Sequence, residues 1–306
     1  MKKCVIIMNP ESGKKKKIKT YHEFYDILRK YGYDTEIIFT KDKGDGEKII
    51  QGLDNNIDLV ISAGGDGTLN EIVTGNLKRS KTLTVAPLPM GSTNDVGNMY
   101  GLHKSVFENL EIILKGKQKK VDICYINETP FVYVACLGDY VDLAYSTPRN
   151  LKKRYGKIAY ILYGAKQIFN KLHSYDIKYK VDGKEYEGTY SFIFITNSSR
   201  VAGQPDIYYD VKLDDNMFEV ALANVKNKKD MIKMLVLINT MDVKDIPGIT
   251  YYQTNDFEIE FLSKLKTSWC IDGEEYKETT DKFKFSVNQK MKMLVPKENM
   301  NQLFDD

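Results

Sequence analysis

The residues best suited to chemistry form a glycine-rich turn that contains one acidic residue, Gly64–Gly67. The apolar run Leu59–Ala63 precedes it and a helical pattern starts at Thr68, so the segment is predicted to be a buried strand, a turn and a helix. This arrangement brings backbone N–H groups to a phosphate at the helix N-terminus, and glycines allow close approach. Asp66 would repel a bare phosphate, so it indicates a nucleotide bound with a metal ion. A simple tight turn is the alternative for these four residues taken alone.

Two further segments repeat the order of strand, polar turn and helix. The apolar run Lys3–Met8 leads into Asn9–Lys14, which lacks the spacing of a Walker A loop. The run Thr82–Pro87 leads into Leu88–Asp95, where hydroxyl and amide groups could bind phosphate or metal-bound water. Asn94 and Asp95 could also cap the helix that follows. Alternating strands and helices predict a doubly wound parallel sheet with its ligands at the carboxyl ends of the strands.

The second half of the chain has a different pattern. Short alternating runs separated by Gly, Asn and Asp predict strands at 131–137, 175–181, 189–197, 217–224, 256–261, 267–272 and 283–287. Helices are expected at about 159–172 and 229–238. We therefore predict two domains in the 306 residues: a nucleotide-binding α/β domain over 1–126 and a β-sandwich substrate domain over 127–290, with 291–306 packing back on the first domain.

Taken together, the motifs resemble those of the diacylglycerol kinase catalytic-domain family, the lipid kinases that include soluble bacterial diacylglycerol kinases and sphingoid-base kinases. The matching segments are the NPxSG-like start of Asn9–Lys14, GGDGTLNE at Gly64–Glu71, and the PxGTxND-like Pro89–Asp95, in which Ser92 replaces Thr. NAD kinases share a related GGDGT but are not expected to carry the third segment. The resemblance implies a nucleotide site made of Asn9, Pro10, Glu11, Ser12, Gly13, Lys14, Thr40, Gly64, Gly65, Asp66, Gly67, Thr68, Leu69, Asn70, Glu71, Ser92, Asn94 and Asp95.

Two segments of the second half also resemble the family. Lys212–Met217 corresponds to a segment that holds a structural magnesium ion, which implies Lys212, Asp215 and Met217 as ligands, two of them through backbone carbonyls. Asn216 replaces the family's usual Gly and tolerates the left-handed backbone of that turn. An acidic hairpin turn is the alternative. Asp272-Gly273-Glu274 reads by itself as a hairpin turn, while the resemblance implies a catalytic carboxylate, either Asp272 or Glu274.

Composition limits the partners. The net charge of +3 is too small to favour nucleic acid, and the four cysteines lack metal spacing, which suggests reduced core residues in a cytoplasmic protein. Basic runs at 14–17 and 149–157 suggest either solvated faces or contact with an anionic membrane. The sequence has no apolar stretch long enough to span a bilayer, so a lipid substrate would be reached from the inner, cytoplasmic face. The family also allows a homodimer.

The function expected from these observations is phosphoryl transfer from ATP, with Mg²⁺, to the hydroxyl of diacylglycerol, giving phosphatidic acid. Asp66 would engage the metal, and Asp272 or Glu274 would act as base in a cleft between the domains. Other lipid acceptors (a sphingoid base, monoacylglycerol or phosphatidylglycerol) are alternatives. An NAD kinase and a non-catalytic regulator that binds nucleotide or lipid are further alternatives. The three histidines belong to none of these motifs.

Overall fold

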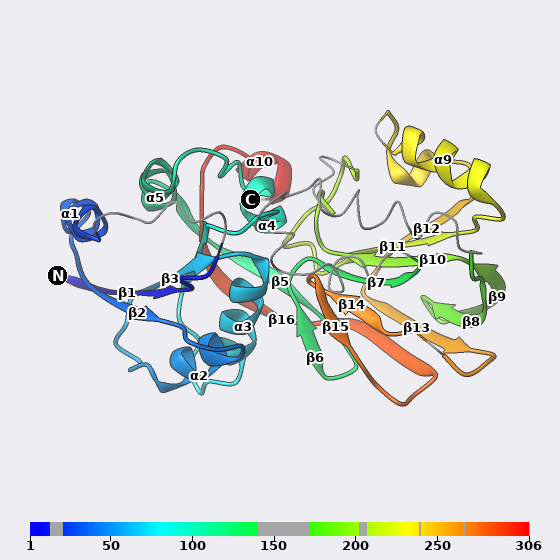
Figure 1. Ribbon diagram of the computed structural model, residues 1–306, viewed down its shortest axis with the longest axis horizontal. Helices are drawn as coiled ribbons and strands as arrows, with labels where there is room; N and C mark the ends of the chain where they lie inside the picture. Colours follow the sequence, from blue (N-terminus) through cyan, green and yellow to red (C-terminus); the bar gives the residue numbers. More distant parts are fainter. Residues whose placement is uncertain (13–20, 140–171, 202–206, 239, 266, 306) are drawn as a thin grey trace. The chain divides into compact units, whose positions relative to one another are not determined.

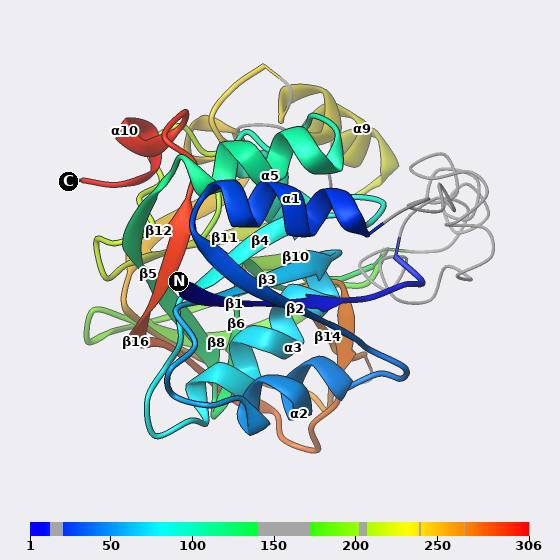
Figure 2. The ribbon, with the colours of Figure 1, turned by 90° about the vertical axis from the view of Figure 1, so that its left-hand side faces the viewer.

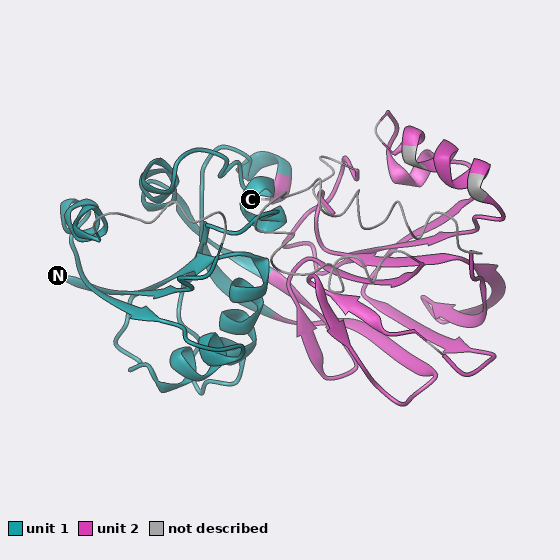
Figure 3. Ribbon diagram, viewed as in Figure 1, with its two compact units in different colours: residues 1–121, 290–302, 306 teal, residues 122–289, 303–305 magenta. Residues whose placement is uncertain are grey.

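The computed structural model describes residues 1–12, 21–139, 172–201, 207–238, 240–265 and 267–305 (Figure 1). These form two compact units (Figure 3). Unit 1 contains residues 1–121 and 290–302, and unit 2 contains residues 122–289 and 303–305. Two strands, β5 and β16, begin in one unit and end in the other.

Unit 1 is built on a parallel sheet with the strand order β2-β1-β3-β4-β16. Its strands are β1 (Lys2–Met8), β2 (Tyr33–Phe39), β3 (Leu59–Gly64) and β4 (Val85–Pro89), with the end of β16 (Lys282–Val295) and the start of β5 (Lys117–Ile126). The strands β1, β3 and β4 are apolar and almost fully buried, as expected for a sheet covered on both faces.

Helices cover both faces of this sheet. Helices α1 (His22–Lys30) and α5 (Val106–Leu114) lie on one face, and α2 (Asp45–Gly52) and α3 (Asp66–Leu77) lie on the other (Figure 2). The short helices α4 (Asp95–Met99) and α10 (Met300–Leu303) complete the unit, apart from Leu303. The predicted doubly wound α/β fold is therefore confirmed for the first half of the chain.

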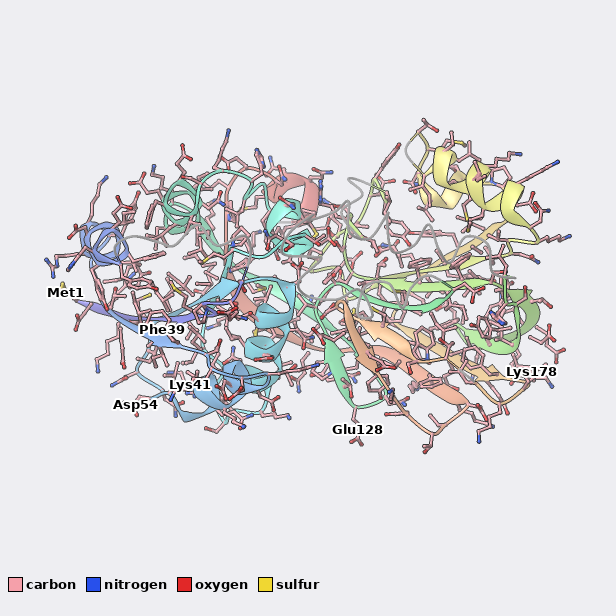
Figure 4. The ribbon with its side chains drawn as sticks, viewed as in Figure 1. Met1, Phe39, Lys41, Asp54, Glu128 and Lys178 are labelled. Carbon is pink, nitrogen blue, oxygen red and sulfur yellow. The ribbon has the colours of Figure 1, made fainter. Side chains whose placement is uncertain are left out.

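Unit 2 consists of two antiparallel layers. One is a six-stranded sheet in the order β12-β11-β10-β7-β14-β15. Its strands are β7 (Val134–Gly138), β10 (Phe192–Thr196), β11 (Phe218–Ala223), β12 (Ile249–Thr254), β14 (Trp269–Ile271) and β15 (Glu274–Tyr276). The other layer has β16, β13 (Asp256–Phe261), β8 (Tyr175–Val181) and β9 (Lys184–Tyr190), while β6 (Thr129–Phe131) pairs with β5. Glu128 lies at the tip of the β5–β6 hairpin and Lys178 on β8 (Figure 4).

A single apolar core fills the space between these layers. Ile193 and Phe218 from one sheet meet Phe257 and Phe285 from the other, and Trp269 packs edge-on against Phe285. The predicted β-sandwich is thus confirmed. Outside the sandwich lie α9 (Lys228–Leu237) and the 3₁₀ turn Val243–Asp245.

Some predicted elements differ from the structure. The strand predicted at 131–137 is two strands, β6 and β7, because the N–H groups of Val132 and Tyr133 donate to a carboxylate instead of a neighbouring strand. The strand predicted at 283–287 is part of a longer strand, β16, which runs through the polar residues 288–290 to Val295. Residues 159–171 of the predicted helix lie outside the described residues, as do the basic runs at 149–157 and 14–17 and the predicted site residues Gly13 and Lys14.

All four cysteines are buried and unpaired, as predicted. In the described parts of the chain, no helix is both long and apolar enough to cross a membrane.

Candidate active site

The segments that follow β1 and β3 diverge to opposite faces of the sheet in unit 1. Strand β1 lies between β2 and β3, and the chain continues to α1 on one face but to α3 on the other (Figure 2). Such a reversal leaves a crevice at the carboxyl ends of the two strands, where α/β proteins bind ligands. Here the Asn9 N–H donates to the carbonyl of Ala63 (2.9 Å), and its side-chain amide donates to Thr68 Oγ1 (3.2 Å). The predicted first and second loops are therefore joined by hydrogen bonds.

The glycine-rich turn places the N-terminus of α3 at this crevice. Gly65 is the N-cap in an extended conformation, and no side chain caps it. Its carbonyl accepts the N–H groups of Thr68 and Leu69. A Cβ on Gly64 would lie 2.5 Å from the Thr68 side chain, so a larger residue does not fit there. The positive end of the α3 dipole and the half-buried backbone of residues 65–67 suit a phosphate group.

The loop after β4 contacts the glycine-rich turn through its backbone. A Cβ on Gly91 would come within 2.6 Å of the Gly65 α-carbon, so glycine is required for this approach. Asn94 holds the loop closed, because its side chain accepts the Gly91 N–H (2.7 Å) and donates to the Gly91 carbonyl (3.0 Å). Asn94 itself is left-handed, with φ of 54°. The third predicted segment thus lies beside the second.

Asp66 joins the two loops in a way that the sequence does not predict. Its Oδ2 accepts the N–H of Asp95 (3.0 Å) and its Oδ1 accepts the N–H of Val96 (3.2 Å), which are the first two residues of α4. The expected capping of α4 by Asn94 or Asp95 is wrong: the Asn94 side chain bonds to Gly91, and Asp95 is 1% exposed. Asp66 supplies the cap because a carboxylate is favoured by the N–H groups and the dipole of a helix start.

Several of the residues predicted to bind the nucleotide are buried or are hydrogen-bonded to other parts of unit 1. Both Glu71 oxygens accept backbone N–H groups at the start of α2, from Gly44 (2.8 Å) and Gly46 (3.1 Å). Leu69 and Thr40 are buried. By contrast, Ser92 is exposed to solvent, as are Pro10 and Glu11. Ser12 and Asn70 are half-buried.

A small hollow lies at the carboxyl ends of β3 and β4, next to the α4 N-terminus. Asp66 is its one charged side chain, and apolar groups form most of its wall. It is lined by Ser62, Gly64, Gly65, Asp66, Leu69, Pro87, Leu88, Pro89, Asn94, Val96 and Gly97.

In unit 2, Asp272 and Gly273 form the predicted hairpin turn between β14 and β15. Both have positive φ, 49° and 86°, which is typical of a two-residue type I′ turn. The Asp272 carboxylate, 3% exposed, accepts three backbone N–H groups, from Val132 (2.7 Å), Tyr133 (3.0 Å) and Val134 (3.1 Å). Asp272 therefore fixes the junction between β6 and β7.

Glu274 begins β15 and its side chain is exposed. A buried carboxylate whose two oxygens already accept three N–H groups is poorly placed to take a proton from a substrate hydroxyl. An exposed carboxylate two residues away is better placed. Of the two predicted catalytic acids, Asp272 positions its turn, whereas Glu274 is exposed to solvent; the choice of base between them stays a prediction.

The segment 212–217 is folded as a tight acidic turn. Asn216 is left-handed, with φ of 63°, as its replacement of Gly requires. Its N–H donates to the buried carboxylate of Asp122 (2.6 Å). Asp215 accepts the Met217 N–H through Oδ1 (2.9 Å) and the Gln253 side chain through Oδ2 (3.1 Å). Lys212 extends to the chain end, where its Nζ donates to the carbonyl of Phe304 (3.2 Å).

Burial, followed by the negative charges of Asp122, Asp305 and Asp214, raises the pKa of Asp215. A nearby cation would oppose the effect of those charges. In the described residues, no group of three or more His, Cys, Asp or Glu side chains is arranged to hold a metal. The predicted set differs from such a group, since it combines one carboxylate with the backbone carbonyls of Lys212 and Met217. Its oxygen donors and the surrounding negative charge fit Mg²⁺.

The residues that support this turn come from distant parts of the chain. Asp122 is an isolated acid in an apolar strand, a pattern that predicts a buried, hydrogen-bonded role, and this role is confirmed. Gln253 lies on β12, a strand that the sequence analysis did not predict, so nothing in the local pattern linked it to Asp215.

Comparisons with known proteins agree with this architecture. Residues 3–126 match the diacylglycerol kinase catalytic domain family. A diacylglycerol kinase of Staphylococcus aureus (strain bovine RF122 / ET3-1) is 29% identical over 274 residues, which cover 89% of this chain and 86% of that protein. The diacylglycerol kinase of strain MRSA252 is 28% identical over the same length.

Solved structures show the same fold. A diacylglycerol kinase structure from Bacillus anthracis strain Sterne superimposes with a TM-score of 0.79 at 23% identity, covering 98% of this chain and 99% of that chain. Another structure from the same strain gives 0.81, covering 97% and 98%.

Unit 1 is thus a doubly wound α/β domain, and unit 2 is a β-sandwich. Residues 3–126 are similar to the diacylglycerol kinase catalytic domain family, and this similarity supports a lipid kinase.

The role of Asp66 can be tested by substitution. Asp66→Ala leaves the N–H groups of Asp95 and Val96 without their carboxylate, so the loops after β3 and β4 should separate and phosphoryl transfer should be abolished. Loss of the cap should cost about 1–2 kcal/mol of stability, measured by urea unfolding, and amide exchange at residues 95 and 96 should become faster. Asp54→Ala, at an exposed position of unit 1 (Figure 4), is the matched control. Transfer by Asp66→Ala near the parent rate would refute the role.

Proposed function

We propose that the protein is an ATP-dependent kinase that phosphorylates the hydroxyl of diacylglycerol and releases phosphatidic acid and ADP. The observation that carries the proposal is the joining of three loops at the carboxyl ends of β1, β3 and β4, around an α3 N-terminus that no side chain caps. The names of the Staphylococcus aureus relatives support diacylglycerol as acceptor.

In the proposed reaction the loops of unit 1 hold the triphosphate of ATP. The backbone of Gly64–Thr68 and the side chains of Asn9 and Ser92 would bind the phosphates, and Asp66 would keep the loops together. Magnesium, when bound with ATP, neutralises the phosphate oxygens and favours attack at the γ-phosphorus. Asp66 would also contact the metal ion or one of its water molecules through a carboxylate oxygen, since such an oxygen can accept more than one partner.

The acceptor chemistry is assigned to unit 2. The lipid hydroxyl oxygen attacks the γ-phosphorus, the bond from that phosphorus to the bridging oxygen of ADP breaks, and the hydroxyl proton passes to Glu274. The proposal therefore needs a catalytic cleft to which unit 1 supplies the nucleotide and unit 2 supplies the base. Because its acceptor is a membrane lipid, the protein would work at the inner membrane surface.

Assays with labelled ATP test the function directly. Transfer of the γ-phosphoryl group would be measured with Mg²⁺ to diacylglycerol, monoacylglycerol, a sphingoid base, phosphatidylglycerol and NAD, each lipid in mixed micelles. We expect labelled phosphatidic acid as the dominant product. Label mainly on another lipid would keep the mechanism and change the acceptor, whereas label on NAD would overturn the lipid assignment. ATP binding without any transfer would favour a regulatory protein.

The assignment of the base predicts unequal effects of two substitutions. Glu274→Gln should lower kcat by about 10²–10⁴-fold with ATP binding unchanged, since only the proton acceptor is lost. Asp272→Asn should lower the stability of unit 2 as well, because an amide cannot accept all three N–H groups of Val132–Val134. Glu275→Gln, at the neighbouring position of β15, is the control. A Glu274→Gln enzyme at the parent rate, together with a stable but inactive Asp272→Asn enzyme, would make Asp272 the base.

We also propose that Lys212, Asp215 and Met217 hold a structural Mg²⁺. The ion would offset the negative charge around Asp215, so Mg²⁺ without ATP should raise the thermal midpoint of the parent protein. Asp215→Asn should remove most of that increase, and Asp214→Asn, next to it in the same turn, should keep more of it. An equal Mg²⁺-dependent increase in the parent and in Asp215→Asn would exclude the site.

A further inference from the structure

Helix α9 presents two large aliphatic side chains to solvent. Ile232 and Val236 are each 60% exposed, whereas Met231 is 9% exposed. Met231 and Met234 attach the helix to unit 2 by packing in a small cluster with Ala223 and Val225. Ile232 and Val236 are four residues apart and therefore neighbours on the helix surface, on the side away from Met231 and Met234. Figure 1 shows α9 in yellow, outside the strands of the sandwich.

Two lysines share this outward face. Lys229 and Lys233 are exposed and are also four residues apart. At 3.6 residues per turn they alternate with the aliphatic pair, because Lys229 lies one turn before Ile232 and Lys233 one turn before Val236. We name these four residues, Lys229, Ile232, Lys233 and Val236, the α9 face. Asp230 is the one acidic residue of the α9 sequence, and the Asn227 side chain donates to its carboxylate (2.8 Å) in the first turn.

The N-terminus of α9 is capped, which stabilises the helix that carries the α9 face. Asn227 caps α9 by accepting the N–H groups of Lys229 and Asp230 (2.9 and 3.1 Å). Exposed Lys226 lies just before the cap and adds positive charge at the same end.

We propose that the α9 face docks on an anionic lipid bilayer, with Ile232 and Val236 entering the acyl boundary and Lys229 and Lys233 contacting lipid phosphates. Lysine stems are long enough to lie along apolar surface while their ammonium groups remain at the level of the headgroups. The proposal rests on the proposed function, because a diacylglycerol acceptor is located in a membrane.

Charge and size favour a bilayer over a protein partner. Two aliphatic side chains form a much smaller apolar area than the roughly 800 Å² per partner of a stable protein interface. The lysines add positive charge without an acid on the same face, which matches anionic headgroups. A bilayer needs no complementary shape, so a small apolar pair with flanking lysines is sufficient for weak, reversible docking.

The test is sedimentation of the full chain with vesicles of phosphatidylcholine, with and without phosphatidylglycerol. Lys229→Gln with Lys233→Gln should weaken binding to the anionic vesicles by about fivefold for each lysine and reduce its salt dependence. Ile232→Ser with Val236→Ser should weaken binding by at least tenfold and leave the salt dependence in place. The matched control is Leu262→Ser with Lys264→Gln, which changes an exposed aliphatic residue and an exposed lysine elsewhere in unit 2.

Three results would overturn the proposal. Parent-like vesicle binding by both α9 variants would exclude the α9 face as the docking site. An equal loss of vesicle binding in the control variant would show that the position of the α9 face has no special role. An α9 variant that changes the oligomeric state in analytical ultracentrifugation but still binds vesicles would make the face a subunit interface. Transfer to diacylglycerol in detergent micelles separates this inference from the proposed function, since the α9 variants should retain the parent rate there. If the parent protein lacks micellar transfer, the proposed function fails while vesicle binding still tests the α9 face.

Discussion

The carboxylate of Asp66 is the interaction on which the candidate nucleotide site depends. It belongs to the first turn of α3 yet accepts the first two N–H groups of α4, so a single side chain joins the loops after β3 and β4. The backbone contact between Gly65 and Gly91 leaves no room for a side chain on Gly91, and a Cβ on Gly65 would be in tight contact, 3.3 Å from the Gly91 α-carbon. Together with the hydrogen bond from Asn9 to Thr68, these contacts join the loops at the ends of three parallel strands.

In unit 2, too, buried carboxylates hold irregular backbone in place by accepting its N–H groups. Asp272 satisfies three N–H groups between β6 and β7, and Asp122 satisfies that of Asn216 in the acidic turn. Buried N–H groups without an acceptor are costly, and a carboxylate can accept several of them. In both places the buried carboxylate is close in sequence or in space to a more exposed one, Glu274 or Asp215.

The proposed function needs both a rigid nucleotide site and access to a membrane substrate. The hydrogen-bonded loops of unit 1 would suit a triphosphate, because phosphoryl transfer depends mainly on positioning and charge stabilisation. Helix α9 is attached to unit 2 through Met231 and Met234, in a small apolar cluster separate from the sandwich core, and its opposite side carries the α9 face.

The sequence by itself determined the fold class, the three loops and the hairpin at Asp272, because each follows from local periodicity and turn chemistry. Only the tertiary structure decided what each acid does. Asp66 bonds to residues about thirty positions later, Asp122 to a residue about ninety positions later, and Asp272 to residues about 140 positions earlier. Such partners leave no trace in a local pattern, since a hydrogen bond depends on position in space. The split of β6 from β7 and the single course of β16 were missed for the same reason.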